Sequence, residues 1–369
     1  QRPFNYAAVN FAAAERTDAT STASDDSERV IAESLRDIAN TTLGFEKVFA
    51  VGLRDRMDKR DAMTIGASLS GIHLEWIDGV HLSDMSDKSY PAGWNTEDPI
   101  PAQLGAWRAH MNALQRIVNE EISTALIFED DIDWDVTIKA QLKQFARGVR
   151  ALQETSSVSS FSPYGENWDV LWLGGCGAGT KPSSRVYMIP NDTTVPPRSR
   201  HFPTEILKPV FAEWEGLENA RFVFDAADVP CSLAYAVTFE SARKILIKWS
   251  LEPNSQPFDN DLRELCNPFN SHGTSLRCLA PYPLLFNSYR KEGPDFQGSD
   301  IHNDGDSWHE AYTNGITYST MLNSKRLVNG AKTALAQYPE VDPQLLEFDG
   351  LELPRGNLTS WNLRLYQPE

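Results

Sequence analysis

Residues 125–131 read Ala125-Leu126-Ile127-Phe128-Glu129-Asp130-Asp131, four apolar residues followed at once by three acidic ones. An apolar run of this length is typical of a buried strand. In sheets of parallel strands, ligands bind beyond the carboxyl ends of the strands, which is where the acidic triplet falls. The stretch therefore predicts both a central strand and a candidate binding site.

The sequence on either side of this stretch alternates between short apolar runs and longer segments with helical spacing. Strands are predicted at 47–51, 74–77, 169–173 and 234–239, and helices at 58–68, 103–118 and 241–249. Strands that alternate with helices indicate an α/β fold, in which a mostly parallel sheet is covered by helices on both faces. The hydrophobic content of 41% is ample for such a core.

Composition divides the chain into three parts. Residues 1–42 are rich in Ala, Ser, Thr and Asp, contain one candidate helix over 26–38, and are expected to form a stem or a flexible N-terminal segment. Residues 43–313 are expected to form one catalytic domain, because α/β enzymes of this size often form a single unit. Residues 314–369 are expected to be an extension that packs on this domain and holds a helix over 324–337.

Two further segments lack a regular pattern. Residues 155–167 and 177–203 are rich in Ser, Pro, Gly and Thr, and we expect both to be long loops. Long loops of compact domains often serve as lids or binding elements. Their sequence carries no readable code for a ligand.

The charge balance argues against one class of partner. The chain has 51 acidic and 34 basic residues, a formal net charge of -17, and no dense stripe of Lys and Arg. We therefore expect no nucleic acid partner, since binding to nucleic acid needs clustered positive charge. An anionic ligand would need a metal ion or grouped arginines to offset the acidity.

Hydropathy argues against a membrane span. No run of about 18 apolar residues occurs, and the first ten residues lack the basic and apolar regions of a signal peptide. The chain begins with Gln rather than Met, which fits the removal of an upstream signal or anchor. We therefore expect the chain as given to be soluble.

Cysteines and glycosylation sequons indicate the compartment. The four cysteines lack the spacing of zinc sites and allow three disulfide pairings, of which Cys266 with Cys278 is the most local; four buried thiols are an equally good alternative. Three N-x-Ser/Thr sequons lie in polar or turn-like stretches, at Asn40, Asn191 and Asn357. Together these features favour the lumen of the secretory pathway, such as the Golgi, or secretion.

Three adjacent carboxylates repel one another, and a divalent cation relieves that repulsion. Hard oxygen ligands suit Mn²⁺ or Mg²⁺, which could bridge the carboxylates to a diphosphate. A solvated acidic turn is the alternative, and the position after a buried strand favours a site. Asp133 and Asp135 follow in the same turn and are expected either to support the site or to be solvated.

Blocks of sequence around the triplet match a known pattern in order and spacing. Residues 52–63 follow the pattern Asn-Leu-x-x-Arg-x-x-x-Arg-x-x-Met, with Gly52 in place of Asn, and residues 105–110 follow Gly-x-x-x-Ser-His, with Ala109 in place of Ser. The other blocks are Asp78-Gly79, 126–132, 168–174, 234–237, 257–262 and 298–301. Together the blocks resemble glycosyltransferase family 25, which includes lipooligosaccharide and procollagen galactosyltransferases. The resemblance spans about residues 45–303.

The resemblance implies a GT-A-like fold and a nucleotide-sugar donor, usually UDP-galactose, with inversion at the anomeric carbon. Glu129 and Asp131 are expected to bind the metal ion, and the resemblance adds His302 as a third ligand. A metal ion stabilises the charge that develops on the leaving diphosphate. The residues expected to contact the donor are Leu53, Arg56, Arg60, Asp78, Gly79, Glu129 and Asp130. The two arginines among them could equally be surface charges of a helix.

Direct displacement with inversion needs a carboxylate that takes the proton of the acceptor hydroxyl. Asp259 and Asp261 are the candidates for this base. The alternative is that both simply lie in the first turn of a helix, where acidic side chains favour the helix dipole. His110, beside Trp107 on a predicted helix, is expected to be a buried, hydrogen-bonded histidine.

The acidic triplet together with the resemblance thus implies an inverting, metal-dependent glycosyltransferase that moves a hexose, usually galactose in the family it resembles, from a UDP-sugar to a hydroxyl of a glycan or glycoprotein. Two alternatives stay open. One is a catalytically inactive module that binds sugar nucleotides or glycans, which the departures at Gly52 and Ala109 would fit. The other is a glycoside hydrolase that uses two carboxylates, one as acid and one as base or nucleophile.

Overall fold

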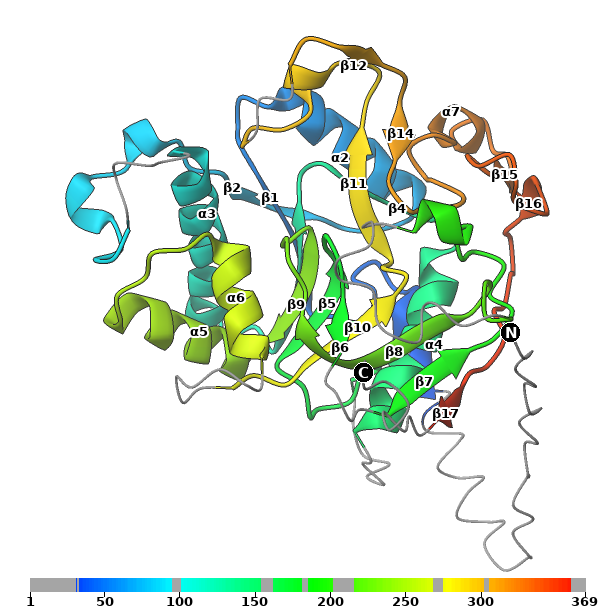
Figure 1. Ribbon diagram of the computed structural model, residues 1–369, viewed down its shortest axis with the longest axis horizontal. Helices are drawn as coiled ribbons and strands as arrows, with labels where there is room; N and C mark the ends of the chain where they lie inside the picture. Colours follow the sequence, from blue (N-terminus) through cyan, green and yellow to red (C-terminus); the bar gives the residue numbers. More distant parts are fainter. Residues whose placement is uncertain are drawn as a thin grey trace, which may run out of the picture.

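The computed structural model describes residues 31, 33–94, 101–153, 162–180, 185–201, 216–267, 275–301 and 305–359. These residues form an α/β structure around one large mixed sheet (Figure 1). Its longest path follows the strand order β17-β7-β8-β10-β5-β9-β3-β1-β2. These strands are β1 (Lys47–Gly52), β2 (Glu75–Asp78), β3 (Thr124–Glu129), β5 (Val170–Gly174), β7 (Val186–Ile189), β8 (Arg221–Asp228), β9 (Ala234–Thr238), β10 (Cys278–Tyr282) and β17 (Asn357–Thr359).

The central strands mostly run in one direction. β1 pairs in parallel with both β2 and β3, and β10 pairs in parallel with β5. β9 lies antiparallel between β3 and β5, so β5 and β10 point the same way as β1, β2 and β3. The structure therefore confirms the predicted α/β class with a mostly parallel central sheet. β8, β7 and β17 extend this sheet by antiparallel pairings.

A second group of strands lies at the acidic end of β3. β4 (Ile132–Trp134) follows the triplet and pairs with β11 (Phe286–Arg290), which also pairs with β5 and with β14 (Tyr312–Thr313). Short ladders join β12 (Gly293–Pro294) to β13 (Trp308–His309), and β6 (Gly179–Thr180) to β8. β11 therefore brings a late part of the chain beside the acidic triplet (Figure 1).

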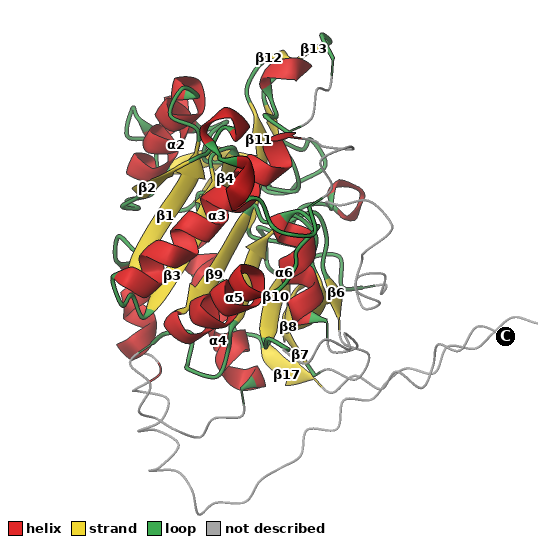
Figure 2. Cartoon of the chain, turned by 90° about the vertical axis from the view of Figure 1, so that its left-hand side faces the viewer, coloured by secondary structure: helices red, strands yellow, loops and turns green. Residues whose placement is uncertain are grey.

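Helices cover both faces of the sheet (Figure 2). α3 (Pro101–Asn119), α5 (Phe239–Leu251) and α6 (Phe258–Cys266) pack on one face, and α2 (Met57–Leu69) and α4 (Ile138–Leu152) on the other. β3 contributes Ala125 and Ile127 to the first core and Leu126 and Phe128 to the second. Because both of its faces are covered, β3 is a continuous apolar run rather than an alternating pattern.

Most predicted elements are present, with bounds that differ by one or two residues. The predicted helices are α2, α3 and α5, and the predicted strands are β1, β2, β3, β5 and β9. α4 was not predicted, although its buried residues Leu142, Phe145, Val149 and Leu152 recur with helical spacing. The local patterns therefore identified the central sheet and part of its cover.

Two predictions for the less regular parts are wrong. The helix expected over 324–337 ends after about one turn, as α7 (Ser324–Leu327), because Gly330 takes a left-handed φ of +79°. The residues that follow form β15 (Thr333–Leu335), which pairs with β16 (Leu345–Glu347).

The loop expected over 177–203 contains β6 and β7, because a short run of strand-forming residues lies between its polar flanks. For the other expected loop, at 155–167, residues up to 161 lie outside the described part of the chain.

The segment expected to be a stem is partly folded onto the domain. Its described end includes the 3-10 helix η1 (Leu35–Ala39), which buries Leu35 and Ile38 in the same core as α4. The packed unit therefore begins before residue 43. The rest of this segment, and most of the helix expected over 26–38, lie outside the described residues.

Asp133 and Asp135 are buried, which rules out one of their two expected states, that of simply solvated side chains. Asp133 is 0% exposed and accepts hydrogen bonds from the hydroxyls of Thr313 (2.7 Å) and Ser319. Asp135 is 1% exposed and accepts one from Tyr318 N (2.9 Å). Burial raises the pKa of each carboxyl to about 6, although the hydrogen-bond donors oppose the shift. The two side chains therefore tie the C-terminal part of the chain to the sheet.

All four cysteines are paired in disulfides. Cys266–Cys278 joins α6 to β10 and confirms the pairing that closeness in sequence predicted. The other bridge, Cys176–Cys231, joins the residues after β5 to those before β9. The alternative of four buried thiols is therefore wrong.

The surface agrees with the interpretation of the sequons. The three sequon asparagines, Asn40, Asn191 and Asn357, are exposed, so glycans attached there would lie in water. Among the helices of the described residues, none has the length and apolar character needed to cross a membrane.

Replacing Ser319 by Ala should destabilise the protein, because Asp133 would stay buried but lose a hydroxyl donor. A buried group left without its hydrogen bond costs about 1–3 kcal/mol, and the free energy of unfolding from denaturant titration should fall by that amount. Ser68→Ala is the matched control, since Ser68 is exposed on α2 and its loss should change stability by about 0.5 kcal/mol or less. Equal stability of the two variants would contradict the role given to Asp133.

Candidate functional site

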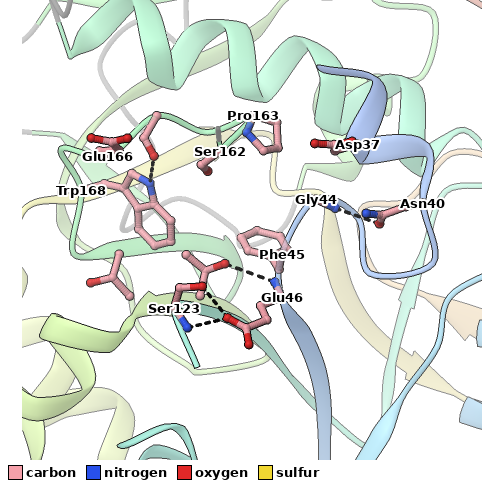
Figure 3. Close-up of a pocket in the computed structure, with 13 residues that line it drawn as sticks. Asp37, Asn40, Gly44, Phe45, Glu46, Ser123, Ser162, Pro163, Glu166 and Trp168 are labelled. Carbon is pink, nitrogen blue, oxygen red and sulfur yellow. Dashed lines mark hydrogen bonds between the residues drawn. The ribbon is translucent and has the colours of Figure 1, made fainter. Parts of the chain in front are cut away.

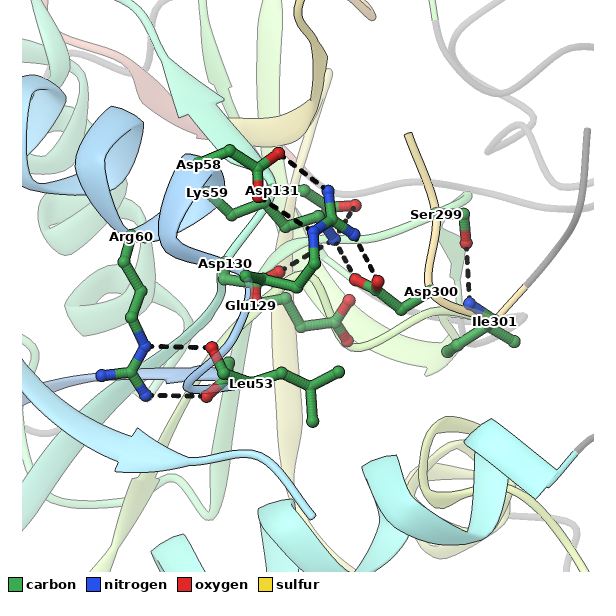
Figure 4. Close-up of polar contacts among 12 residues, drawn as sticks. Leu53, Asp58, Lys59, Arg60, Glu129, Asp130, Asp131, Ser299, Asp300 and Ile301 are labelled. Atoms are coloured by element: carbon green, nitrogen blue, oxygen red, sulfur yellow. Dashed lines mark hydrogen bonds and ion pairs between the residues drawn. The ribbon is translucent and has the colours of Figure 1, made fainter. Parts of the chain in front are cut away.

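The acidic triplet lies at the carboxyl end of β3, where Asp130 and Asp131 are close to Lys59 (Figure 4). Glu129 is the last residue of β3, and its Oε1 accepts a hydrogen bond from Ser232 Oγ (2.7 Å). Asp130 and Asp131 occupy the turn between β3 and β4. The repulsion expected between adjacent carboxylates is reduced because Glu129 has a hydroxyl partner and the two aspartates have cationic partners.

Lys59, on α2, is the centre of the acidic cluster (Figure 4). Its Nζ lies 3.1 Å from Asp130 Oδ1, 3.6 Å from Asp131 Oδ2 and 2.7 Å from Asp300 Oδ2. The lysine is only 9% exposed. Burial alone would lower the pKa of Lys59, but the three carboxylates outweigh this effect and raise the pKa above its ordinary value. A protonated amine therefore stands where three carboxylates converge.

The two aspartates that share Lys59 differ in their tendency to ionise. Burial raises the pKa of Asp130, and the neighbouring charge of Asp131 adds to the effect. Burial also opposes ionisation of Asp131, but Lys59 and Arg290 hold its pKa below the ordinary value. Arg290 Nη1 lies 2.9 Å from Asp131 Oδ2. Asp131 is therefore the more firmly anionic of the two.

Residues 297–300 are fastened to the start of α2. Arg56 donates a hydrogen bond to Gln297 O (2.7 Å) and forms an ion pair with Asp300. Arg56 Nε also donates to Asp58 Oδ1 (3.0 Å). Asp300 is thus held between Arg56 and the ammonium group at the centre of the cluster.

Arg60 stabilises the turn after β1. Its Nε donates to Leu53 O (3.0 Å), and its Nη2 donates to Asp78 Oδ1 (2.8 Å). Its guanidinium also lies 4.3 Å from the ring centroid of Trp76. These contacts join the carboxyl ends of β1 and β2 and engage the guanidinium of Arg60 within the protein.

Glycine is required at two positions beside the triplet. A Cβ on Gly52 would lie 2.3 Å from Asp130 Oδ2 and 2.7 Å from Asp130 Cβ, so a side chain would displace Asp130. A Cβ on Gly79 would lie 2.8 Å from Leu53 N. The departure from the family pattern at Gly52 thus follows from the close approach of Asp130 to β1.

Glu129 and Asp259 are linked through consecutive residues of the chain. Ser232 Oγ donates to Glu129 Oε1 (2.7 Å), and Cys231 N donates to Asp259 Oδ2 (3.0 Å). Asp259 lies in the first turn of α6. The structure therefore brings Asp259 close to the acidic end of β3.

His110 has the buried, hydrogen-bonded environment that was expected. It is 3% exposed, and its Nδ1 lies 3.0 Å from Tyr235 Oη. Its ring stacks on Phe258 with 4.4 Å between centroids, and its Nε2 lies 3.6 Å from Glu129 Oε1. His110 therefore joins α3 and α6 next to Glu129.

Asp261 has different surroundings from Asp259. It is 7% exposed, and within the described part of the chain its Oδ2 has no hydrogen-bond partner. Burial raises the pKa of Asp261 to about 7, and the neighbouring side chain of Asn254 only partly opposes the shift. The structure thus separates the two base candidates: Asp259 contacts the segment that holds Glu129, and Asp261 is buried near the end of α5.

Of the three metal ligands expected, Glu129 ends β3 and Asp131 lies in the turn that follows it. His302 lies outside the described residues. Within the described ranges, no three His, Cys, Asp or Glu side chains are arranged to hold one metal ion. The available donors are carboxylate oxygens, which suit Mn²⁺ or Mg²⁺ chemically. A metal ion that uses Asp131 would therefore compete with Lys59 and Arg290, which pair with this carboxylate.

A cavity of about 490 Å³ lies at the opposite end of the sheet (Figure 3). Its lining includes Glu46 beside the start of β1, Thr124 at the start of β3, and Trp168. At about 3.3 Å per strand residue, Thr124 is roughly 17 Å from Glu129. The cavity is therefore separate from the acidic cluster.

Several residues of the cluster were not singled out from the sequence, namely Lys59, Ser232, Arg290 and Asp300. Arg290 contacts Asp131 across 159 residues of chain, so no local pattern connects them. Lys59 and Asp300 did lie inside the blocks of the family pattern, which was the available signal.

Comparison with known proteins supports the resemblance that the motifs indicate. Procollagen galactosyltransferase 2 of Mus musculus is 22% identical over 144 residues, which cover 36% of this chain and 21% of the relative. Procollagen galactosyltransferase 1-A of Xenopus laevis is 22% identical over 146 residues, with 36% and 21% covered. Inactive glycosyltransferase 25 family member 3 of Homo sapiens is 21% identical over 143 residues, with 36% and 22% covered.

The chain is thus similar to glycosyltransferase family 25, and the match spans about a fifth of the length of these relatives. No family model matches the chain. A solved structure of mannose-1-phosphate geranyltransferase from Thermus thermophilus is 12% identical, covers 68% of this chain and 63% of that one, and has a TM-score of only 0.24.

Lys59→Met should lower stability strongly, because it leaves Asp130 and Asp131 buried without their shared cation. Removing one partner of a buried ion pair costs about 3–5 kcal/mol, measurable as the free energy of unfolding at pH 7. Lys244→Met is the control, since the ion pair of Lys244 with Asp169 is half-exposed and worth about 1 kcal/mol or less. If the two variants lose similar amounts, Lys59 does not have the central role described.

Asp261→Asn should change the pH dependence of stability. The pKa of Asp261 is about 7 in the folded chain and about 4 in the unfolded chain, so the folded state binds an extra proton between these values. The contribution of this extra proton to the free energy of unfolding is fully present below about pH 4 and is lost as the pH rises through about 7. The variant lacks the titration, so from pH 5 to pH 8 its stability should improve relative to the wild type by roughly 1–3 kcal/mol. A stability difference that is the same at both pH values, measured by denaturant unfolding, would argue against the shifted pKa.

Proposed function

We propose that this chain is a glycosyltransferase that transfers galactose from UDP-galactose, with inversion, to a hydroxyl of a glycan or glycoprotein. The proposal rests on one observation: the charged cluster lies at the end of β3, and Asp259, a carboxylate outside this cluster, is linked to Glu129 through Cys231 and Ser232. Such a transfer needs a site for the leaving diphosphate and a base for the acceptor. The similarity to procollagen galactosyltransferases supports a glycosyltransferase at the level of the family.

The donor side of the proposed reaction is the charged cluster. Arg56, Lys59 and Arg290 are cations whose present partners are carboxylates at the same edge of the sheet. Phosphate oxygens are also anionic, and ammonium and guanidinium groups bind them through charge-assisted hydrogen bonds. Donor binding would therefore exchange one anionic partner for another at groups that are already largely desolvated.

The nucleoside part of the donor is proposed to lie along the carboxyl ends of β1 and β2. Leu53, Asp78 and Gly79 are half-buried there, and Asp130 approaches Gly52 at the same edge. The contacts of Arg60 hold this edge together. Arg60 would thus act on the donor by fixing the shape of its site.

A divalent cation, Mn²⁺ or Mg²⁺, is proposed to be held by Glu129 and Asp131, with His302 completing the ligands. When bound, it would stabilise the negative charge that develops on the leaving diphosphate. Asp131 suits this role because its pKa is held low, and Glu129 because its carboxylate is partly accessible. Lys59 would then give up its longest contact, with Asp131, and keep its shorter contact with Asp300.

Asp259 is proposed as the base that removes the proton of the acceptor hydroxyl while that oxygen attacks the anomeric carbon. Asp259 is half-buried, and one of its oxygens is fixed by Cys231 N. Asp261 is the second candidate, with a pKa near neutrality that suits a base. Its burial near Asn254 makes it the less accessible of the two.

A binding module without catalysis is the second candidate function. Lys59 already neutralises the carboxylates that a metal ion would need, and this arrangement would also fit a site that binds a sugar nucleotide without turnover. Two of the similar proteins, from Bos taurus and Homo sapiens, are named probable inactive and inactive. Binding without release of UDP would select this candidate.

We also place the proposed activity in the lumen of the secretory pathway, in the Golgi, or outside the cell. Two disulfides and three exposed sequon asparagines support such a compartment. The acceptor would then be a glycan or glycoprotein that passes through the same space.

Calorimetry with UDP-galactose, UDP-glucose and UDP-N-acetylglucosamine, each with and without Mn²⁺, tests the proposal, with UDP release as the measure of turnover. We expect the wild type to bind UDP-galactose most tightly and only when Mn²⁺ is present. At a ligand concentration of 100 times Kd, the free energy of unfolding should rise by about 2.7 kcal/mol. Asp131→Asn should abolish the Mn²⁺-dependent binding.

Asp259→Asn should keep donor binding and lose about 10²- to 10⁴-fold in UDP release, because the base is absent. Asp261→Asn is the matched comparison, and a loss confined to this variant would move the base to Asp261. A wild-type protein that binds none of the three donors, with or without Mn²⁺, would contradict the proposed function.

A further inference from the structure

The connection between β8 and β9 lies between two carboxylates of the proposed site. Cys231 N donates to Asp259 Oδ2 (3.0 Å), and Ser232 Oγ donates to Glu129 Oε1 (2.7 Å). Leu233 O accepts a hydrogen bond from Glu129 N (2.9 Å). Three consecutive residues therefore hold the backbone and side chain of Glu129 and the side chain of Asp259.

The backbone of this connection has an uncommon conformation. Cys231 has a φ of +61°, a left-handed value that non-glycine residues rarely adopt. Such a conformation persists only where neighbouring contacts hold it. Trp172 Nε1 donates to Cys231 O (2.9 Å), and Cys176 N donates to Pro230 O (2.7 Å). The connection is thus fastened to β5 and to the residues that follow β5.

The disulfide between Cys176 and Cys231 adds a covalent tie at this point. It joins the residue with the left-handed backbone to the segment after β5, with 5.3 Å between the Cα atoms. Gly175 permits the close approach, since a Cβ there would lie 2.7 Å from Pro230 O. Without the tie, Cys231 could relax to a more favourable backbone conformation and turn its N–H group away from Asp259.

We propose that the Cys176–Cys231 disulfide is a positioning element of the site, which holds the backbone of residue 231 and thereby places Asp259 and Glu129 relative to each other. The inference rests on the proposed function, because these two carboxylates are the proposed base and a proposed metal ligand. The bridge acts only through them. A small displacement of reacting groups can cost about 100-fold in rate, so a tie of this kind has a measurable effect.

The second disulfide provides a matched control. Cys266–Cys278 joins the last residue of α6 to the first residue of β10, whereas Asp259 lies in the first turn of that helix. Its removal also deletes a covalent tie, but at the other end of α6. The two bridges therefore separate a general loss of stability from a local loss of positioning.

The test uses three double variants: Cys176→Ala/Cys231→Gly, Cys176→Ala/Cys231→Val and the control Cys266→Ala/Cys278→Ala. Glycine adopts a φ of +61° readily, whereas the β-branched valine does not. Amide hydrogen exchange, followed by mass spectrometry on peptides covering 229–235, reports on the connection without any turnover. UDP release from UDP-galactose is then expressed per binding-competent molecule, counted by the calorimetric stoichiometry.

Loss of the first bridge should speed exchange of residues 229–235 by about tenfold or more, and further with valine than with glycine. The kcat per binding-competent molecule should fall about 100-fold with valine and about tenfold with glycine, while the KM for UDP-galactose stays within about threefold. The control should stay within about threefold of the wild type in both readouts. If the valine variant does not fold, the glycine variant carries the test.

Unchanged exchange of residues 229–235 after loss of the first bridge would overturn the inference. The same holds if activity falls only in proportion to the fraction of molecules that bind the donor. If the wild type releases no UDP from any nucleotide sugar, the proposed catalytic function fails instead. The exchange measurement then still decides whether the bridge holds the connection between β8 and β9.

Discussion

The five carboxylates between residues 129 and 135 are largely shielded from solvent. Much of the structure supplies the cations and hydrogen-bond donors that pair with them. A buried carboxylate needs a cation or hydrogen-bond donors, because an unpaired charge in a protein interior costs several kcal/mol. The partners come from α2, from the connection between β8 and β9, from β11, and from β14 and the residues after it. The acidic end of β3 is therefore the place where early, middle and late parts of the chain meet.

The partners are of two chemical kinds, and the difference separates structure from reactivity. Asp133 and Asp135 are met by hydroxyl and amide groups, which satisfy the carboxylates and carry no net charge to offer a ligand. Asp130 and Asp131 are met by Lys59 and by a guanidinium, whose charge can turn to another anion. The residues at and after the end of β3 thus have two sets of contacts. The hydroxyl and amide partners are neutral and fixed, whereas the cationic partners can bind another anion instead.

The features that the sequence predicted are those with a local signal. The apolar run of β3 and the helical spacing of α3 each lie within one element, and the more local disulfide closes a loop of only 12 residues. The bridge between Cys176 and Cys231 spans 55 residues and could not be told from the other pairings. Lys59 meets Asp300 across 241 residues, and a lysine on a helix has the same pattern whether it faces water or a cluster. The helix expected over 324–337 had suitable composition, but tertiary packing turned its second half into a strand.

The anchoring of Asp133 also sets an order in which the molecule can be completed during synthesis. Thr313 and Ser319 follow Asp133 by 180 and 186 residues, so a nascent chain presents this carboxylate to water long before its partners have left the ribosome. Closing so long a loop is costly in entropy, and contacts between distant residues form late. The apolar strands can pack together as they are synthesised, whereas Asp133 cannot form its hydrogen bonds until Thr313 and Ser319 have been synthesised. The end of the sheet proposed to carry the chemistry is thus completed late, and a chain whose synthesis stopped before residue 313 would lack both hydroxyl partners of Asp133.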